Sequence, residues 1–411
     1  MGRRMVRGSM VYEGDEGDEM NDYETFVAAK RPVVPVSGFE PTFLPETLFP
    51  YQRDNVAWAV RTGRCALFLD TGMGKTIQQL AWAKNVTAHT GKPVLVLAPL
   101  AVARQTVREA AKFGLDGVVY ALDGTAAGDV LVTNYERLDR FDPSKFGGVV
   151  LDESGILKNY TGATRRALTE AFAATPYRLC CSATPAPNDH LELGTHAEFL
   201  GVMSSHQMIS RWFINDTSSF GTYRLKGHAV ADFCDWVSSW AVMASVPSDL
   251  GDYDDSGYGL PNLSTVEHVE VMPQEIDRAA GTLFRIVDLN ATAVHAERRR
   301  SASVRAARVA SLVAAEPAEP WLIWCDTDYE ADELVEALRP VVGDGSAEVR
   351  GTMTPEAKES ALCAFGDGTT RVLVTKPKIA GFGLNWQHCA RVAFVGATFS
   401  FESWYQAIRR C

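Results

Sequence analysis

Residues 65–83, CALFLDTGMGKTIQQLAWA, decide the fold of this chain. An apolar run predicts a buried strand, two glycines follow, and a lysine and a threonine open a segment with helical periodicity. Such a turn can hold phosphates with backbone N–H groups, a lysine and a Mg²⁺-binding hydroxyl. The strict pattern G-x-x-x-x-G-K-[ST] fails because Leu69 holds its first position, and a glycine turn with a chance lysine is the alternative. The preceding strand and following helix favour a phosphate-binding loop at 71–76.

The same alternation continues on both sides of this loop. Short apolar runs predict strands at 65–70, 94–100, 129–134, 147–153, 177–185, 321–326, 371–376 and 390–397. Amphipathic segments predict helices at 76–89, 101–114, 162–174, 306–315, 329–340 and 357–368. Continuous apolar strands alternating with helices are typical of parallel sheets covered on both faces. We therefore expect an α/β protein with two lobes in tandem, each a mostly parallel sheet flanked by helices.

Composition divides the 411 residues further. Residues 1–40 lack apolar periodicity and predict an acidic, disordered tail. Residues 41–260 form the expected first lobe and 261–411 the second. The net charge of −11 argues against a nucleic-acid partner, yet much of the acidity lies in residues 1–30 and 248–255, so a local basic groove remains compatible with one.

The remaining composition points to the cytoplasm. Apolar stretches reach only about ten residues, short of a membrane span, and no apolar run follows the N-terminal arginines as a secretory signal would require. The eight cysteines form no C-x-x-C pair, which predicts reduced thiols and no zinc site.

Three further motifs carry polar groups suited to nucleotide chemistry. VVLDES predicts a strand ending in Asp152 and Glu153, which could hold Mg²⁺ and position or deprotonate a water. An acidic pair at a strand end is more often a solvated turn, but its place downstream of Lys75 reverses that expectation. Residues 182–184, SAT, could hydrogen-bond the acidic pair, and Gln52, which stands ahead of an expected helix, could read adenine with its amide, although each is weak alone.

Taken in order, FPYQ, LDTGMGKT, VLAPLAV, LVTNYE, VVLDES, CSATPAPN, VLVTKPKIAGFGLNW and YQAIRR resemble the motifs of superfamily-two helicase motors. The resemblance covers about residues 45–411 and is closest to the Snf-type remodeller and translocase branch, including helicase-like proteins carried by bacteriophages. It implies two RecA-like lobes, with ATP and Mg²⁺ in the cleft between them, in a bacterial or phage-infected cell. The implied partner is DNA, duplex more than single-stranded, with RNA a weaker candidate. A partner protein of a replication, repair or defence complex is also implied, and no membrane.

The resemblance also implies roles for residues that match its motifs. The adenine and phosphates would be held by Gln52, Thr71, Gly72, Met73, Gly74, Lys75 and Thr76, and from the second lobe by Gly383 and Gln406. The catalytic set would be Lys75, Asp152, Glu153 and Arg410, with Thr76 and Asp152 on Mg²⁺. Ser182 and Thr184 would couple the state of ATP to the grip on the strand, and Gly381, Gly383 and Asn385 would face the cleft.

Nucleic-acid contacts are less visible in the sequence. The resemblance offers Lys158, Asn159 and Lys378, within a wider set of segments at 99–104, 133–136, 158–159 and 376–378. Residues 297–308 are the densest basic cluster, but helical spacing favours a solvated face there over DNA contact. The aromatics around Trp212 and Trp236 are expected in the core.

Two departures from the family pattern leave other functions open. The acidic motif reads D-E-S-G, so the usual fourth residue is absent, and the second arginine of the last motif would fall two positions past Cys411, as if the sequence were truncated there. An RNA helicase is one alternative to a DNA translocase. A nucleotide-binding subunit of a larger complex, with little hydrolysis, is the other.

Overall fold

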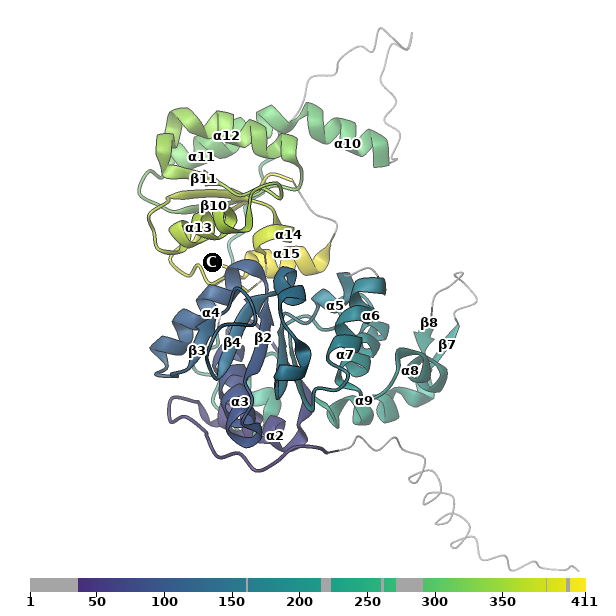
Figure 1. Ribbon diagram of the computed structural model, residues 1–411. Helices are drawn as coiled ribbons and strands as arrows, with labels where there is room; N and C mark the ends of the chain where they lie inside the picture. The colour runs from purple at the N-terminus through teal and green to yellow at the C-terminus, as the bar shows by residue number, and fades with distance from the viewer. Residues whose placement is uncertain are drawn as a thin grey trace, which may run out of the picture.

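The computed structural model describes residues 36–159, 162–215, 223–259, 262–270, 291–381, 383–396 and 400–411. They build two lobes, the first coloured purple to teal and the second green to yellow in Figure 1. Residues 1–35 of the acidic tail predicted at 1–40 lie outside the described residues. None of the helices in the described ranges is both long and apolar enough to cross a membrane.

The first lobe is built on a seven-stranded parallel sheet with the order β3-β4-β2-β5-β6-β1-β9. Its strands are β1 Arg64–Leu69, β2 Val94–Ala98, β3 Val118–Tyr120, β4 Val130–Asn134, β5 Gly148–Asp152, β6 Tyr177–Cys181 and β9 Ala241–Ala244. The five central strands are almost wholly buried because helices cover both faces. The antiparallel pair β7 Phe213–Asn215 and β8 Tyr223–Leu225 stands apart from this sheet.

Side chains of β1 alternate between the two faces. Cys65, Leu67 and Leu69 pack on one side with the first helices, whereas Ala66 and Phe68 pack on the other with the later ones. The first group is α2 Pro50–Thr62, α3 Lys75–Thr90 and α4 Leu100–Lys112. The second is α5 Ile156–Asn159, α6 Gly162–Ala171, α7 Leu193–Leu200, α8 Ser205–Trp212 and α9 Val230–Ser238. Short 3-10 turns connect them at Tyr135–Arg140, Pro143–Lys145, His190–Glu192, Gly227–Ala229 and Pro247–Leu250.

The second lobe repeats the plan on a smaller scale. Its parallel sheet has the order β11-β12-β10-β13, with β10 Trp321–Trp324, β11 Ser346–Glu348, β12 Val372–Thr375 and β13 Arg391–Phe394. The helices are α10 Ala291–Arg300, α11 Ala302–Ala315, α12 Asp328–Val342, α13 Pro355–Gly366, α14 Pro377–Ala380 and α15 Phe401–Ile408, with a 3-10 turn at Gly343–Gly345. Helices α11 and α12 pack on one face of the sheet, and α13 and α15 on the other. The expectation of two parallel α/β lobes is confirmed.

The aromatic residues between β6 and β9 belong to the core, as the sequence predicts. Trp212 and Trp236 are buried and stack with ring centroids 4.6 Å apart. Phe233 and Trp240 extend the cluster towards Phe68 of β1. They fix the later helices to the sheet and are closed to a nucleic-acid base.

Candidate nucleotide site between the lobes

The phosphate loop joins β1 to α3 at the carboxyl edge of the first sheet, where parallel α/β sheets place ligands. Gly72 and Gly74 have φ angles of 91° and 71°, the left-handed region that glycine adopts without strain. A Cβ at Gly74 would overlap the side-chain amide of Gln52, so a larger residue would both strain the left-handed backbone and displace Gln52 from the loop. The Nζ of Lys75 donates to the carbonyls of Leu69 at 2.8 Å and Asp70 at 3.1 Å.

Gln52 lies directly against this loop. The sequence placed it ahead of a helix, and this is wrong, because Pro50 opens α2 and puts Gln52 in its first turn. Its Nε2 donates to the carbonyl of Met73 at 3.3 Å and to the hydroxyl of Tyr51 at 3.1 Å, while its Oε1 accepts from the backbone N–H of Phe49. The side chain therefore supports the loop, and its role as adenine reader stays a prediction.

The acidic pair lies at the end of β5 and is buried. Asp152 and Glu153 are 6% and 7% exposed, and Glu153 has a φ of 53°, the one positive φ of a non-glycine residue among the described residues. Burial and the neighbouring Glu153 raise the pKa of Asp152 to about 7, against the opposing charge of Lys75. The pair is thus not the solvated turn that an isolated acidic strand end suggests.

The D-E-S-G departure has a structural counterpart. The backbone N–H of Ser154 donates to the carbonyl of Cys181 at 2.8 Å, so the acidic motif meets the next motif through the main chain. The side chains of Ser154 and Gln79 are completely buried. Ser154 lies beside the thiol of Cys180, and Gln79 lies beside the carboxylate of Asp152 and opposes the rise of its pKa. The side-chain oxygens of Ser154 and Gln79, with the desolvated carboxylate of Asp152, form an oxygen-rich site that fits a hydrated Mg²⁺ ion beside a phosphate.

Thr184 links the acidic edge of the first lobe to α15 of the second. Its hydroxyl donates to Oε1 of Glu402 at 3.0 Å and accepts from Nε2 of Gln406 at 3.1 Å. Its backbone N–H donates to the hydroxyl of Ser182 at 3.2 Å. The SAT segment therefore contacts the opposite lobe directly, which is what a coupling element requires.

Arg410 is 4% exposed and turns into its own lobe. Its guanidinium donates to the carbonyls of Gln406 at 2.9 Å and Leu384 at 3.2 Å, and also contacts the side chain of Gln406. Burial lowers the pKa of Arg410, and the charges of Glu153 and Asp152 oppose that shift. Arg410 therefore lies within the electrostatic reach of the acidic pair, and its catalytic role stays a prediction.

The arginine that reaches the phosphate loop is its neighbour Arg409, which the motif pattern did not mark. Its Nη1 lies 2.5 Å from Oδ2 of Asp70, and the hydroxyl of Tyr405 donates to the same oxygen at 3.0 Å. The sequence held two signals for this contact, the doublet Arg409–Arg410 and a carboxylate just before the loop. Neither signal indicates which arginine crosses the cleft.

Two residues that the resemblance implies to face the cleft, Gly383 and Asn385, contact α4 of the first lobe. Gly383 has a φ of 69°, and a Cβ there would overlap the side chain of Val102. The backbone N–H of Asn385 donates to Oε1 of Gln105 at 3.3 Å. Gly381 is closed in by the carbonyl of Pro377.

The candidate nucleic-acid residues differ in their exposure to solvent. Lys378 is exposed on α14, whereas the side chains of Lys158 and Asn159 at the end of α5 lie outside the described residues. In the segment 133–136, Thr133, Asn134 and Tyr135 are buried, which leaves only an acid in solvent. The basic cluster 297–308 is a solvated face only in part: Arg299 and Arg308 are exposed, but four of its five arginines form ion pairs. These pairs are Arg298–Asp326, Arg300–Glu297, Arg305–Glu330 and Arg308–Glu270.

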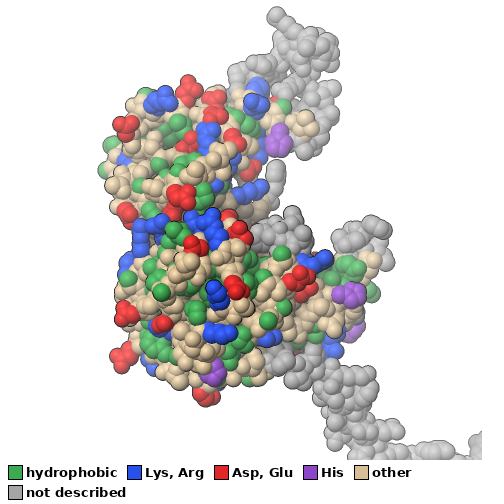
Figure 2. Space-filling model, in the orientation of Figure 1, with side chains coloured by type: hydrophobic (Ala, Val, Ile, Leu, Met, Phe, Trp, Pro, Cys, Tyr) green, Lys and Arg blue, Asp and Glu red, His purple; other side chains and the backbone are tan. Residues whose placement is uncertain are grey.

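A second group of arginines lies where the lobes meet. Arg104, Arg108 and Arg137 of the first lobe form ion pairs with Glu359, Asp367 and Glu356 of the second. Figure 2 shows Lys and Arg side chains gathered at this junction, over the position of α4 in Figure 1. The two lobes are thus held by charge on one side of the junction and by α15 at the phosphate loop.

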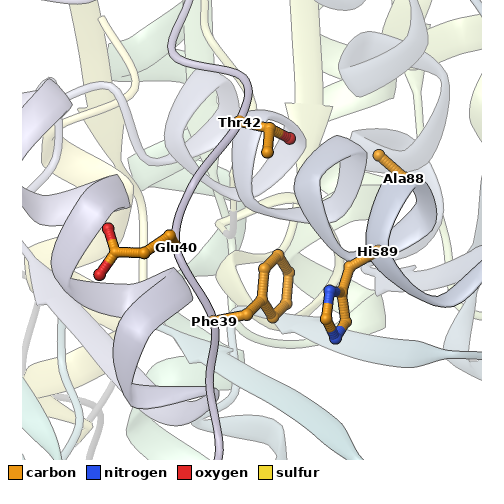
Figure 3. A pocket seen from close by; sticks show the side chains of 5 residues that line it. All are labelled: Phe39, Glu40, Thr42, Ala88 and His89. Atoms are coloured by element: carbon orange, nitrogen blue, oxygen red, sulfur yellow. The ribbon is translucent and has the colours of Figure 1, made fainter.

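A surface hollow lies elsewhere, at the far end of α3. Figure 3 shows it lined by Phe39, Glu40, Thr42, Ala88 and His89, with the rings of Phe39 and His89 stacked 3.8 Å apart. Fourteen residues separate His89 from Lys75 along α3, which is roughly 21 Å of helix. The hollow therefore does not belong to the phosphate site.

Comparison with protein families matches residues 51–226 to the SNF2-related domain and residues 305–411 to the helicase conserved C-terminal domain. These matches support the Snf-type resemblance and give no support to its bacteriophage branch.

Individual relatives are similar over part of the chain. The SWI/SNF-related matrix-associated actin-dependent regulator of chromatin subfamily A-like protein 1 of Xenopus tropicalis is 31% identical over 185 residues, which are 42% of this chain and 19% of that protein. Helicase domino of Drosophila melanogaster is 26% identical over 238 residues, which are 49% of this chain and 7% of that protein. The matched part thus spans less than a fifth of the length of these relatives. The solved Sulfolobus solfataricus SWI2/SNF2 ATPase core in complex with dsDNA is 17% identical, with a TM-score of 0.44 over 87% of this chain and 83% of that one.

Proposed function

We propose that this chain is an SNF2-family ATPase, a DNA translocase that hydrolyses ATP between its lobes, because an SNF2-related domain and a helicase conserved C-terminal domain match it in succession. The lobes we assign are residues 41–260 and 261–411. One observation carries the proposal. Lys75, the acidic pair and Thr184 gather at the carboxyl edge of one sheet, and α15 of the other lobe contacts that same edge.

The chemistry assigned to these residues follows from their surroundings. Lys75 and the N-terminus of α3 hold the phosphates, and Thr76 and Asp152 are the protein ligands for Mg²⁺. When bound, Mg²⁺ neutralises charge that develops on the phosphates. Glu153 orients the attacking water from a buried position, where a carboxylate acts in a low dielectric.

DNA is favoured over RNA by the kind of relatives that match. Their names describe chromatin regulators and chromatin-remodelling factors, and chromatin is built on DNA. Contacts to the phosphate backbone would suffice, because a tracking motor does not need to read bases. Lys378 is the exposed cation that we assign to such a contact.

The test is ATP hydrolysis measured with duplex DNA, single-stranded DNA and RNA at fixed ionic strength. We expect the largest stimulation with duplex DNA. Stimulation by RNA alone would identify an RNA helicase, and MgATP binding without hydrolysis under any condition would identify a nucleotide-binding subunit.

Two variants and a control assign the site. Lys75→Ala and Glu153→Gln should each abolish turnover, and Glu153→Gln should retain MgATP binding. Glu336→Gln, which alters an exposed acid on α12 of the second lobe, should leave turnover unchanged. Retained turnover in either site variant would show that the site is misassigned.

A further inference from the structure

Asp70 connects the phosphate loop to the second lobe. Its Oδ1 accepts a hydrogen bond from the backbone N–H of Thr71 at 2.6 Å, so the carboxylate is fixed to the first residue of the loop. Its Oδ2 contacts Tyr405 and Arg409 of the α15 region. The side chain of Asp70 is 12% exposed and that of Arg409 is 25% exposed, so solvent screens this ion pair less than a surface pair.

A carboxylate in this position is unfavourable for a phosphate site. ATP brings several negative charges to the loop, and like charges at short range in a partly buried site repel strongly. Lys75 donates to the backbone carbonyl of Asp70 and not to its carboxylate. Arg409 is the cation that forms an ion pair with Asp70 among the described residues, and it comes from the other lobe.

Tyr405 holds Arg409 in this geometry. The guanidinium lies 4.2 Å from the centroid of the Tyr405 ring, within the range of a cation–π contact. The hydroxyl of the same tyrosine donates to the carboxylate oxygen that Arg409 contacts. Burial and the charge of Asp70 raise the pKa of Tyr405 to about 12, so the hydroxyl keeps its proton at neutral pH.

We infer that Arg409 is a positioning residue that neutralises Asp70, so that the phosphate loop reaches full affinity for ATP only when α15 is docked against it. The inference rests on the proposed function and adds that docking of α15 regulates the same site. Docking supplies the compensating charge, and by linkage bound ATP strengthens docking by the same factor. Arg409 differs in this from Arg410, which turns to carbonyls of its own lobe.

The test is a double-mutant cycle on MgATP affinity, measured by isothermal titration calorimetry with the full chain. Arg409→Ala should weaken binding about tenfold, because it leaves the carboxylate of Asp70 unpaired beside the phosphates. Asp70→Asn should bind at least as tightly as wild type, since asparagine keeps an oxygen for the N–H of Thr71. Adding Asp70→Asn to Arg409→Ala should restore affinity to within about twofold of Asp70→Asn alone.

A control separates this effect from a general loosening of the lobes. Arg108→Ala removes an exposed ion pair across the junction, 3.4 Å from Asp367, and should change MgATP affinity by less than about twofold, because solvent screens that pair. If the double variant binds as weakly as Arg409→Ala, Arg409 acts on the nucleotide directly or only on folding, and the inference is overturned.

A measurement without nucleotide distinguishes this failure from a failure of the proposed function. A wild-type chain that does not bind MgATP would contradict the proposed function. The melting temperature of the same four proteins, free of nucleotide, still reports the pair. Non-additive effects of Asp70→Asn and Arg409→Ala are expected, and additive effects would show that the two residues are not coupled.

Discussion

Replacement of Gly383 by alanine should separate the lobes at a defined point. Gly383 has a φ of 69° and faces the side chain of Val102, which is 4% exposed on α4 of the first lobe. The substitution has two costs, a left-handed backbone and a Cβ that overlaps Val102. Only the second cost bears on the junction between the lobes.

Gly368 offers a matched control for the backbone cost. Its φ is 73°, and a Cβ there would meet nothing within 4 Å. Gly368→Ala should therefore lower the free energy of unfolding by about 1–2 kcal/mol through left-handed strain alone. Gly383→Ala should show the same strain plus about 1–3 kcal/mol of overpacking. If the overlap is relieved by undocking, that energy lowers the equilibrium constant for docking roughly 5- to 150-fold.

The assay compares nucleic-acid-stimulated ATP turnover and urea unfolding for the two variants. We expect Gly368→Ala to hydrolyse ATP at the wild-type rate, and Gly383→Ala to lose at least about fivefold. Val102→Ala, combined with Gly383→Ala, removes the methyl groups that the new Cβ would meet and should recover much of the turnover. Equal turnover in Gly383→Ala and Gly368→Ala would refute the view that this contact is needed for hydrolysis.

Three other perturbations have defined outcomes. Burial raises the pKa of Asp152 from 3.8 to about 7, so ionisation of its carboxyl lowers the stability of the wild-type protein as pH rises from 3.8 to 7. Above pH 7, Asp152→Asn should therefore be more stable than wild type, by up to about 4 kcal/mol in urea unfolding. The same variant should hydrolyse no ATP. Asp328→Asn removes the ion pair with Lys376, which lowers the pKa of Asp328, and should lower the melting temperature at low salt, with the difference shrinking in 1 M NaCl. An unchanged difference would exclude a screened pair. Trp240→Ala opens a cavity in the aromatic core and should cost about 3–5 kcal/mol in urea unfolding, and a cost below about 1 kcal/mol would contradict that packing.

The features that could be predicted depend only on residues that are close together in the sequence. The phosphate loop needs only a strand, two glycines and a helix start in sequence, and the helix α3 begins at Lys75 as that pattern requires. The acidic pair needs only the end of an apolar strand. The expectation for Gln52 is wrong by one turn, because Pro50 starts α2 and proline is favoured at the first helical position.

The ion-pair partners of charged residues could not be predicted from the sequence in the same way. The sequence presents residues 297–308 as an exposed basic face, whereas Arg298 and Arg305 pair with Asp326 and Glu330, which come from other elements of the same lobe. A run of arginines reports how much positive charge is present. It does not report which carboxylates the fold brings beside it.

Periodicity and turn chemistry act between neighbours along the chain, so the sequence alone predicts two parallel sheets, the phosphate loop and the acidic strand end. The contacts between the lobes depend on the folded structure. Asp70 and Arg409 are 339 positions apart, and Thr184 and Gln406 are 222 apart. No local pattern distinguishes Arg409 from Arg410. Their different partners follow from the docking of α15, which directs one guanidinium across the cleft and the other into the second lobe.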